Sequence, residues 1–160
     1  MNGFRLVQLR AKSLTPEKYK ELAVQVMTVC KKYDATLMLN AAPSLIEELD
    51  APGVHLNGTC LLSCEHRPIN SAKLVSVACH SLEQIRKAEL IQADMVTLSP
   101  VQHTESHPEA TPLGWKNFSL MARQTVLPVF ALGGINRQLL NHAQANGAYG
   151  IAGIRSFWCA

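Results

Sequence analysis

The chain has 160 residues, of which 48% are hydrophobic and 17% are charged, and its formal net charge is +3. This composition supplies one sizeable hydrophobic core, and it excludes an intrinsically disordered chain and a two-domain enzyme. The weak positive charge forms no basic run, so it predicts no nucleic-acid or membrane partner, although it suits a small anionic ligand. No transmembrane run or secretory leader is recognisable, and the five cysteines are odd in number, so we expect a cytoplasmic protein with free thiols.

Short apolar runs alternate with segments of helical periodicity along the whole chain. In chain order, the predicted elements are a strand at 4–9, a helix at 16–33, a strand at 35–39, a helix at 44–48, strands at 53–56 and 73–79 separated by a loop at 57–71, a helix at 81–91, a strand at 94–98, a loop at 102–112, a helix at 114–123, a strand at 126–132, a helix at 137–146 and a strand at 149–154. Because strands alternate with helices, we predict an α/β fold with a parallel sheet. Periodicity alone leaves two architectures open, a doubly wound sheet and a barrel. No linker divides residues 1–160, so they are predicted to form one domain.

Three polar residues lie on one face at the end of the first predicted strand. Gln8, Arg10 and Lys12 are spaced two residues apart, so their side chains point to the same side of the strand. Parallel α/β proteins bind ligands at the carboxyl ends of their strands, where one amide and two cations suit a diphosphate. The alternative is a solvated strand end with ordinary surface cations.

A glycine pair separates the strand at 126–132 from the helix that follows it. At Gly133 and Gly134, backbone N–H groups could approach a phosphate at the start of the helix, or the pair could form a tight turn without a ligand. Arg155 and Ser156 follow the next strand, and in (β/α)₈ barrels the loops after the last two strands often share a phosphate site. We therefore predict that both loops bind one phosphate.

The run Val7-Gln8-Leu9-Arg10-Ala11-Lys12 resembles the Q-x-R-x-K signature of thiamine phosphate synthase and its TenI-type relatives. Further stretches resemble the same family in the same order, and they lie at 37–40, 53–56, 77–81, 93–94 together with 99–101, 132–135 and 147–152. The resemblance implies a (β/α)₈ TIM barrel rather than an open sheet. It also implies a transferase of thiamine biosynthesis, which joins a pyrimidine alcohol diphosphate to a thiazole phosphate with Mg²⁺ and releases diphosphate. In such a barrel Asn40 would join the residues of the signature around the diphosphate.

Several positions depart from the pattern of this family. The two aspartates that hold Mg²⁺ in the synthases are replaced by Ala41 and Cys60, and neither side chain offers the hard oxygen that Mg²⁺ prefers. We therefore predict no metal site and weak or absent synthase activity. The T-x-T-K loop of the family corresponds to residues 104–107, in which Thr104, Ser106 and His107 are predicted phosphate contacts.

Among the six histidines, His80 is the best candidate for a catalytic residue. It follows the strand at 73–79 and is expected to face the site, where a TenI-type thiazole tautomerase would need a group that takes or gives a proton. The alternative is a hydrogen-bonded structural histidine.

One subgroup of the family resembles the chain more closely. The stretches at 99–108, 113–115 and 154–158 resemble the synthase-like domain that is fused behind MutT-type Nudix hydrolases. The Nudix signature itself is absent from the sequence. A second hypothesis therefore stays open, in which the chain is a non-catalytic ligand-binding or partner domain of a Nudix nucleotide-diphosphate hydrolase.

The length of the chain adds a last expectation. In the family the Q-x-R-x-K strand is normally the second one, so we expect a barrel that lacks its first strand and helix. An open barrel exposes strand edges and core residues. We therefore expect the chain to be part of a longer protein, or to close the gap with a partner such as a second copy in a homodimer.

Overall fold

The computed structural model describes residues 4–105 and 108–158. Seven parallel strands form one sheet in the order of the sequence. The strands are β1 (Leu6–Leu9), β2 (Thr36–Leu39), β3 (Gly53–Leu56), β4 (Leu74–Cys79), β5 (Met95–Leu98), β6 (Val129–Ala131) and β7 (Gly150–Ile151). The helices are α1 (Pro16–Lys32), α2 (Pro43–Glu48), α3 (Gly58–Ser63), α4 (Leu82–Leu90), α5 (Gly114–Ala122), the 3₁₀ turn η1 (Arg137–Leu139), α6 (Leu140–Ala145) and α7 (Arg155–Trp158).

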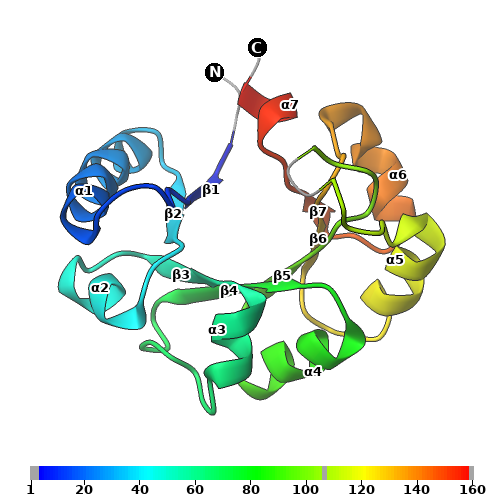
Figure 1. Cartoon of the computed structure of the whole chain (residues 1–160), viewed down its shortest axis with the longest axis horizontal. Coiled ribbons are helices and arrows are strands. Elements are labelled where there is room, and N and C mark those ends of the chain that lie inside the picture. Colours follow the sequence, from blue (N-terminus) through cyan, green and yellow to red (C-terminus); the bar gives the residue numbers. More distant parts are fainter. Residues whose placement is uncertain (1–3, 106–107, 159–160) are drawn as a thin grey trace.

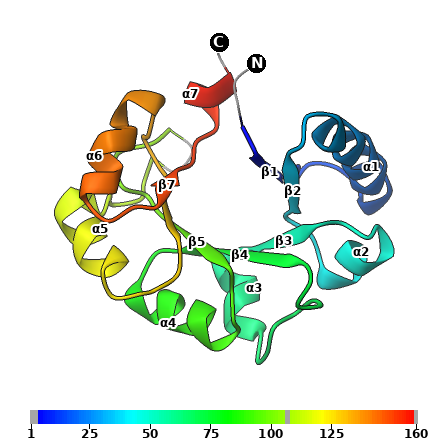
Figure 2. The same cartoon turned by 180° about the vertical axis from the view of Figure 1, so that it is seen from behind.

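The sheet curls into an open barrel, and the helices cover its outer side (Figure 1). Among the described residues, β1 and β7 are the two edges of the sheet and do not pair with each other. The start of β1 and α7 lie side by side at this gap, as the view from behind also shows (Figure 2). There the rings of Phe4 and Phe157 lie 5.4 Å apart, and the Arg137 guanidinium lies 4.7 Å from the Phe4 ring. The predicted α/β fold of the TIM-barrel type is confirmed.

Alternation along the strands separates an apolar outer side from a more polar inner side. The outward side chains pack against the helices in the core, which includes Leu37, Leu39, Val54, Leu56, Val75, Val77, Val96, Leu98 and Phe118. The alternate positions His55 on β3, Ser76 on β4 and Thr97 on β5 carry polar side chains toward the barrel interior. Apolar burial therefore stabilises the sheet against its helices, while the interior keeps polar groups close to the carboxyl ends of the strands.

Side-chain caps begin α1 after β1 and α4 after β4. The Thr15 hydroxyl accepts a hydrogen bond from the Lys18 N–H at 3.4 Å, and Pro16 occupies the first turn of α1. The Ser81 hydroxyl accepts a hydrogen bond from the Gln84 N–H at 3.2 Å and begins α4 two residues after β4. The short connection from β4 brings the first turn of α4 close to the strand end.

The prediction of a loop at 57–71 is wrong in its first part, because α3 occupies residues 58–63. The Asn57 side chain caps this helix by accepting a hydrogen bond from the Cys60 N–H at 2.9 Å, and Leu61 is fully buried. In this helix the six residues show no clear helical period, so the sequence did not indicate it. The strand predicted at 149–154 is also shorter, since β7 ends at Ile151 and α7 begins at Arg155.

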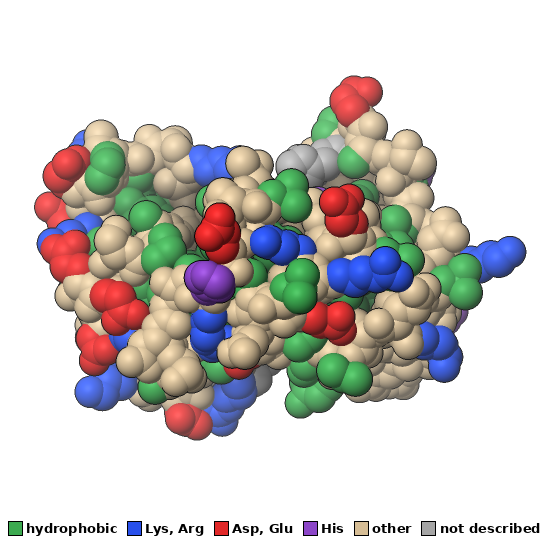
Figure 3. All heavy atoms as spheres, turned by 90° about the horizontal axis from the view of Figure 1, so that it is seen from below, with side chains coloured by type: hydrophobic (Ala, Val, Ile, Leu, Met, Phe, Trp, Pro, Cys, Tyr) green, Lys and Arg blue, Asp and Glu red, His purple; other side chains and the backbone are tan. Residues whose placement is uncertain are grey.

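The lower face of the molecule in Figure 1, where α3 and α4 lie, carries acidic and basic side chains in a mixed pattern (Figure 3). Hydrophobic side chains are scattered between them on this face. The mixture agrees with the small net charge and provides no single-sign field there. None of the helices in the described residues is both long enough and apolar enough to span a membrane.

Candidate functional site

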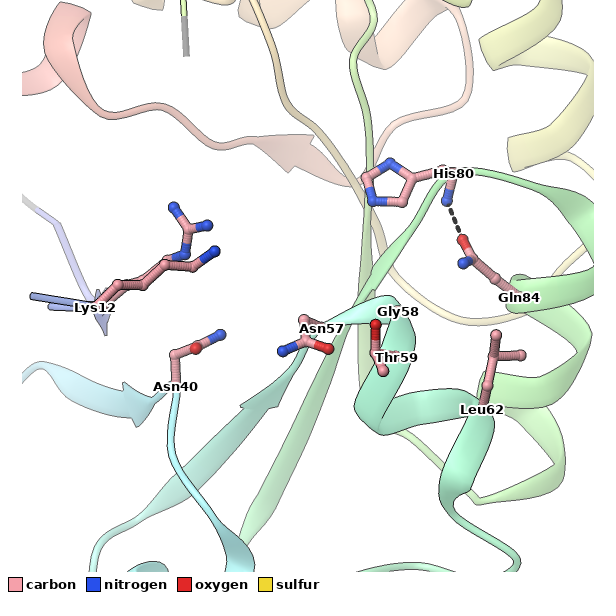
Figure 4. A pocket seen from close by; sticks show the side chains of 9 residues that line it. Lys12, Asn40, Asn57, Gly58, Thr59, Leu62, His80 and Gln84 are labelled. Atoms are coloured by element: carbon pink, nitrogen blue, oxygen red, sulfur yellow. Dashed lines mark hydrogen bonds between the residues drawn. The ribbon is translucent and has the colours of Figure 1, made fainter. Parts of the chain in front are cut away.

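A pocket of about 420 Å³ opens at the carboxyl ends of β1 to β4. Its lining comes from the residues that follow these four strands and from the first turns of α3 and α4 (Figure 4). The lining residues are Arg10, Lys12, Asn40, Asn57, Gly58, Thr59, Leu62, His80 and Gln84. Carboxyl ends of parallel strands meet at one edge of the sheet, so residues far apart in the sequence share this pocket.

Arg10 and Lys12 supply the charge of the pocket. Both side chains are exposed, and no carboxylate of the described residues pairs with either of them. By contrast, Arg67 is paired with Asp94 at 2.7 Å, so cations elsewhere in this fold do find carboxylate partners. Two unpaired cations beside a cavity whose described lining holds no carboxylate favour a phosphate or diphosphate ligand.

Gln8 lies on β1, two residues before Arg10 and on the same side of the strand. It does not line the pocket. Asn40 does line it, and its Nδ2 donates a hydrogen bond to the His55 carbonyl oxygen at 3.3 Å. This bond fixes the amide at the junction of β2 and β3. The structure therefore brings Arg10, Lys12 and Asn40 together as expected, while Gln8 is set back from them.

His80 faces Lys12 across the pocket (Figure 4). Its ring Nδ1 lies 2.7 Å from the Ser99 carbonyl oxygen, and its backbone N–H donates to the Gln84 Oε1 at 2.6 Å. A carbonyl oxygen can only accept, so the neutral ring carries its proton on Nδ1 and leaves Nε2 as an acceptor. His80 is hydrogen-bonded, as the structural interpretation expected, and it also lines the pocket, as the catalytic one requires.

Sequence reasoning missed the contribution of α3 and of Gln84. Asn57, Gly58, Thr59 and Leu62 reach the pocket because Asn57 turns the chain into α3 immediately after β3. The available signal was Asn57 itself, since asparagine is a strong N-cap residue directly behind a strand. Asn57 and Thr59 add uncharged hydrogen-bonding side chains to the wall opposite Lys12, and Leu62 adds an apolar one.

A buried polar pair lies on the inner side of the sheet below the pocket. The His55 Nδ1 lies 2.5 Å from the Ser76 hydroxyl, and both residues are buried. Burial, together with the positive charge of Arg10, lowers the pKa of His55 to about 4. His55 is therefore neutral near pH 7 and adds no positive charge to that of Arg10 and Lys12.

The glycine pair after β6 is required by close packing. Gly133 and Gly134 have φ angles of +95° and +68°, which favour glycine. A Cβ at Gly134 would lie 2.6 Å from the His103 carbonyl oxygen, and one at Gly133 would lie 2.7 Å from Pro100 Cα. No hydrogen bond between described residues uses either N–H as donor. The close packing supports the interpretation as a tight turn, and the N–H groups that donate to no described residue support the interpretation as a phosphate contact. Neither glycine lines the pocket at β1 to β4.

Replacing Gly134 by alanine is expected to cost more free energy of unfolding than replacing Gly114, although both have φ +68°. The left-handed backbone costs about 1–2 kcal/mol in each variant. A Cβ at Gly114 would meet no atom within 4 Å, whereas one at Gly134 would meet the backbone of His103 at 2.6 Å, which adds about 1–3 kcal/mol. Urea unfolding of the two variants measures the difference, and equal losses would contradict the close packing.

Arg155 and Ser156 make contacts within the protein. Arg155 forms an ion pair with Glu105, and the Ser156 hydroxyl donates to the Ile135 carbonyl oxygen at 2.6 Å. The second contact holds α7 against the loop that carries the glycine pair. Phosphate binding by these two residues, and by Thr104 in the loop beside Glu105, stays a prediction. Ser106 and His107 lie outside the described residues.

Comparison with known proteins now assigns the family. The family model described as "Thiamine monophosphate synthase" matches residues 1–157. The chain belongs to the thiamine monophosphate synthase family. A relative in Aquifex aeolicus named "Putative thiamine-phosphate synthase 2" is 40% identical over 155 residues, which cover 97% of this chain and 83% of that protein. The thiamine-phosphate synthase of Caldanaerobacter subterraneus is 30% identical over 158 residues and is covered to 74%.

Solved structures of the thiamine monophosphate synthase family share the fold of the chain. The thiamine phosphate pyrophosphorylase from Pyrococcus furiosus superposes with a TM-score of 0.77 at 21% identity, and the match covers 96% of this chain and 73% of that one. The corresponding protein from Bacteroides thetaiotaomicron gives a TM-score of 0.64 at 25% identity, with 98% of this chain and 73% of that one covered. The TIM-barrel type of architecture is therefore that of the family.

The site does not fit the Mg²⁺ that this thiamine monophosphate synthase family implies. The described lining of the pocket has no carboxylate, and the positions expected to bind the metal hold Ala41 and Cys60. In the described part of the chain, no three His, Cys, Asp or Glu residues come close enough to hold a metal ion. A thiol and a methyl group are poor ligands for a hard cation, so we assign no chemical step to Mg²⁺.

Proposed function

We propose that this member of the family binds a phosphorylated pyrimidine or thiazole of thiamine biosynthesis, and that its synthase activity is weak or absent. One observation carries the proposal. The pocket presents two cations, Arg10 and Lys12, that pair with no carboxylate of the described residues, and its described lining lacks a carboxylate. Anion binding is thus supported, and the metal-dependent departure of diphosphate is not.

In this proposal, Arg10 and Lys12 neutralise the diphosphate and Asn40 orients it from the end of β2. Gly133, Gly134 and the start of α7 at Arg155 and Ser156 hold a second phosphate, as the loops after the last two strands of such barrels do. His80 accepts or returns a proton at Nε2, since its Nδ1 is held by the Ser99 carbonyl oxygen.

An assay of thiamine phosphate formation with both substrates and Mg²⁺ is expected to give a rate at least about 100-fold below that of an active synthase. The reason is the loss of the metal's charge stabilisation, which is several kcal/mol. The Caldanaerobacter subterraneus thiamine-phosphate synthase serves as the positive control. Calorimetry on the same preparation is expected to show that diphosphate still binds. A rate equal to the control would contradict the proposal of weak activity.

A second candidate function is a non-catalytic ligand-binding or partner domain of a Nudix hydrolase. The pocket favours it, because anion-binding residues are present where the carboxylates needed for metal-assisted turnover are not. Binding without any turnover is its expected signature. An in-frame Nudix signature in the DNA upstream of the Met1 codon would support it. The cytoplasmic location and a homodimer also stay predictions.

A further inference from the structure

The loop that follows β5 packs directly against the glycine pair that follows β6. The Gln102 N–H donates a hydrogen bond to the Gly133 carbonyl oxygen at 3.0 Å. A Cβ at Gly134 would lie 2.7 Å from the Gln102 Cβ, so the two loops touch at this residue. Gln102 does not line the pocket at β1 to β4. An influence of Gln102 on a bound ligand would therefore act through the glycine pair.

The side-chain amide of Gln102 joins the glycine pair to α5. Its Nε2 donates to the Gly134 carbonyl oxygen at 2.9 Å, and its Oε1 accepts a hydrogen bond from the Trp115 Nε1 at 3.2 Å. An indole N–H can only donate and a carbonyl oxygen can only accept, so a single orientation of the amide satisfies both partners. Trp115 thus determines which end of the amide meets Gly134.

Trp115 is itself held by two further rings. Its ring lies 5.7 Å from that of Phe118 on α5 and 4.7 Å from that of His142 on α6, and both contacts are edge-to-face. Phe118 is fully buried, and α5 and α6 lie next to each other on this side of the barrel (Figure 1). The indole N–H is therefore presented to Gln102 from a packed position.

The hydrogen bonds of Gln102 orient two peptide planes of the glycine loop. In a trans peptide, the C=O group and the N–H group that follows it point in opposite directions. Gln102 holds the carbonyl groups of Gly133 and Gly134, so the N–H groups of Gly134 and Ile135 point away from it. No hydrogen bond between described residues uses either of these N–H groups as donor. Successive N–H groups in such a loop form a concave site for an anion.

We propose that Gln102 and Trp115 are positioning residues for the phosphate that the glycine pair holds. This inference rests on the proposed function, which places a second phosphate there. Gln102 fixes the two carbonyl groups, and Trp115 fixes the amide of Gln102. Neither side chain touches the phosphate, because both act through the N–H groups of Gly134 and Ile135. Glycine peptides rotate easily, so without these bonds the N–H groups would no longer converge on one anion.

Titration with inorganic phosphate, followed through the NMR signals of the backbone amides, tests the proposal. In the unsubstituted chain, phosphate is expected to shift the amide signals of Gly134 and Ile135. These two signals separate a phosphate at the glycine pair from one at Arg10 and Lys12.

Two variants remove the hydrogen bonds of the Gln102 amide. Gln102→Met keeps the length of the side chain but loses both bonds, and it is expected to weaken phosphate binding at the glycine pair about tenfold, the equivalent of one hydrogen bond to a charged group. Trp115→Phe keeps an aromatic ring and loses the indole N–H. The Gln102 amide then keeps its bond to Gly134 but loses its anchor, so a weakening of about threefold is expected.

Gln124→Met is the matched control. Gln124 is exposed just after the end of α5, far from Trp115 along the helix, and its amide donates to the Leu120 carbonyl oxygen at 3.3 Å. Its phosphate affinity should stay within about twofold of that of the unsubstituted chain.

The outcomes separate the positioning role from the proposed function. Unchanged phosphate affinity in folded Gln102→Met, or in Trp115→Phe if Gln102→Met does not fold, would overturn the positioning role alone. The affinity for inorganic diphosphate at Arg10 and Lys12 should stay within about twofold in both variants, and an equal loss at both sites would indicate a general loss of structure and would also overturn the positioning role. Absence of phosphate-induced shifts at the glycine pair of the unsubstituted chain would overturn the second phosphate of the proposed function, and with it this inference.

Discussion

An Arg10→Ala/Lys12→Ala double variant is expected to bind inorganic diphosphate at least about 100-fold more weakly than the unsubstituted chain. Each hydrogen bond between a cation and a phosphate oxygen contributes about 1.5–3 kcal/mol, and every 1.4 kcal/mol is about tenfold in affinity. Neither cation has a carboxylate partner among the described residues, so no internal ion pair has to be broken first. Arg10→Ala alone should cost about 1–3 kcal/mol. Isothermal titration at constant ionic strength measures both losses.

A Lys31→Ala/Lys32→Ala variant controls for the loss of charge alone. Both lysines are exposed in the last turn of α1, at the end of the helix opposite to the pocket. The control also removes two positive charges. Because salt screens charges over such a distance, the loss of Lys31 and Lys32 should have little effect on the affinity for diphosphate. Equal weakening by the two double variants would contradict the placement of the diphosphate and would indicate non-specific attraction.

The fold was largely predictable because two independent signals agree. Alternating apolar runs and helical periods predict parallel strands with helical crossovers, and the seven strands lie where they were expected. Closure into a barrel is different, since the same local patterns suit an open sheet. Only the resemblance to a family separated the two architectures. The helix α3 was not predicted, because residues 57–71 show no clear period and Leu61 is the one fully buried side chain of this helix.

The candidate site was predictable where it depends on strand ends. Arg10, Lys12, Asn40 and His80 each follow a strand, and parallel strands bring their carboxyl ends together, so all four line one pocket. The glycine pair and the turn at Arg155 also follow strands, but these strands are β6 and β7, away from the pocket at β1 to β4. Distance around the barrel is a property of sheet order and curvature, which local sequence does not specify.

The pair of His55 and Ser76 depends on the register between two strands. In the sheet, His55 of β3 stands directly opposite Ser76 of β4. Twenty-one positions separate them in the sequence, and a shift of one residue in the pairing would turn one side chain to the other face. The sequence therefore shows a histidine inside an apolar strand, but its partner and its protonation follow only from the three-dimensional arrangement.

The free energy of unfolding is expected to fall by up to about 3 kcal/mol between pH 6.5 and pH 4 because of His55. The pKa of His55 is about 4 in the folded chain, against 6.5 for an ordinary histidine. Between pH 6.5 and about pH 4, His55 is therefore protonated in the unfolded chain and neutral in the folded chain. More protons on the unfolded state mean that stability rises with pH in this window, and the full contribution is present above pH 6.5.

Urea unfolding at several pH values, with His55→Gln and His66→Gln as a matched pair, tests this expectation. His55→Gln removes the buried titrating ring, so the slope of the free energy of unfolding between pH 4 and 6.5 should decrease by up to about 1.4 kcal/mol per pH unit. His66→Gln removes an exposed histidine and is the control for the substitution itself. Arg10 contributes to the lowered pKa of His55, so Arg10→Ala should move the lower end of the window upward. An unchanged slope in His55→Gln would mean that His55 takes up its proton in the folded chain as easily as in the unfolded one, and the buried pair with Ser76 would then not exclude the charge.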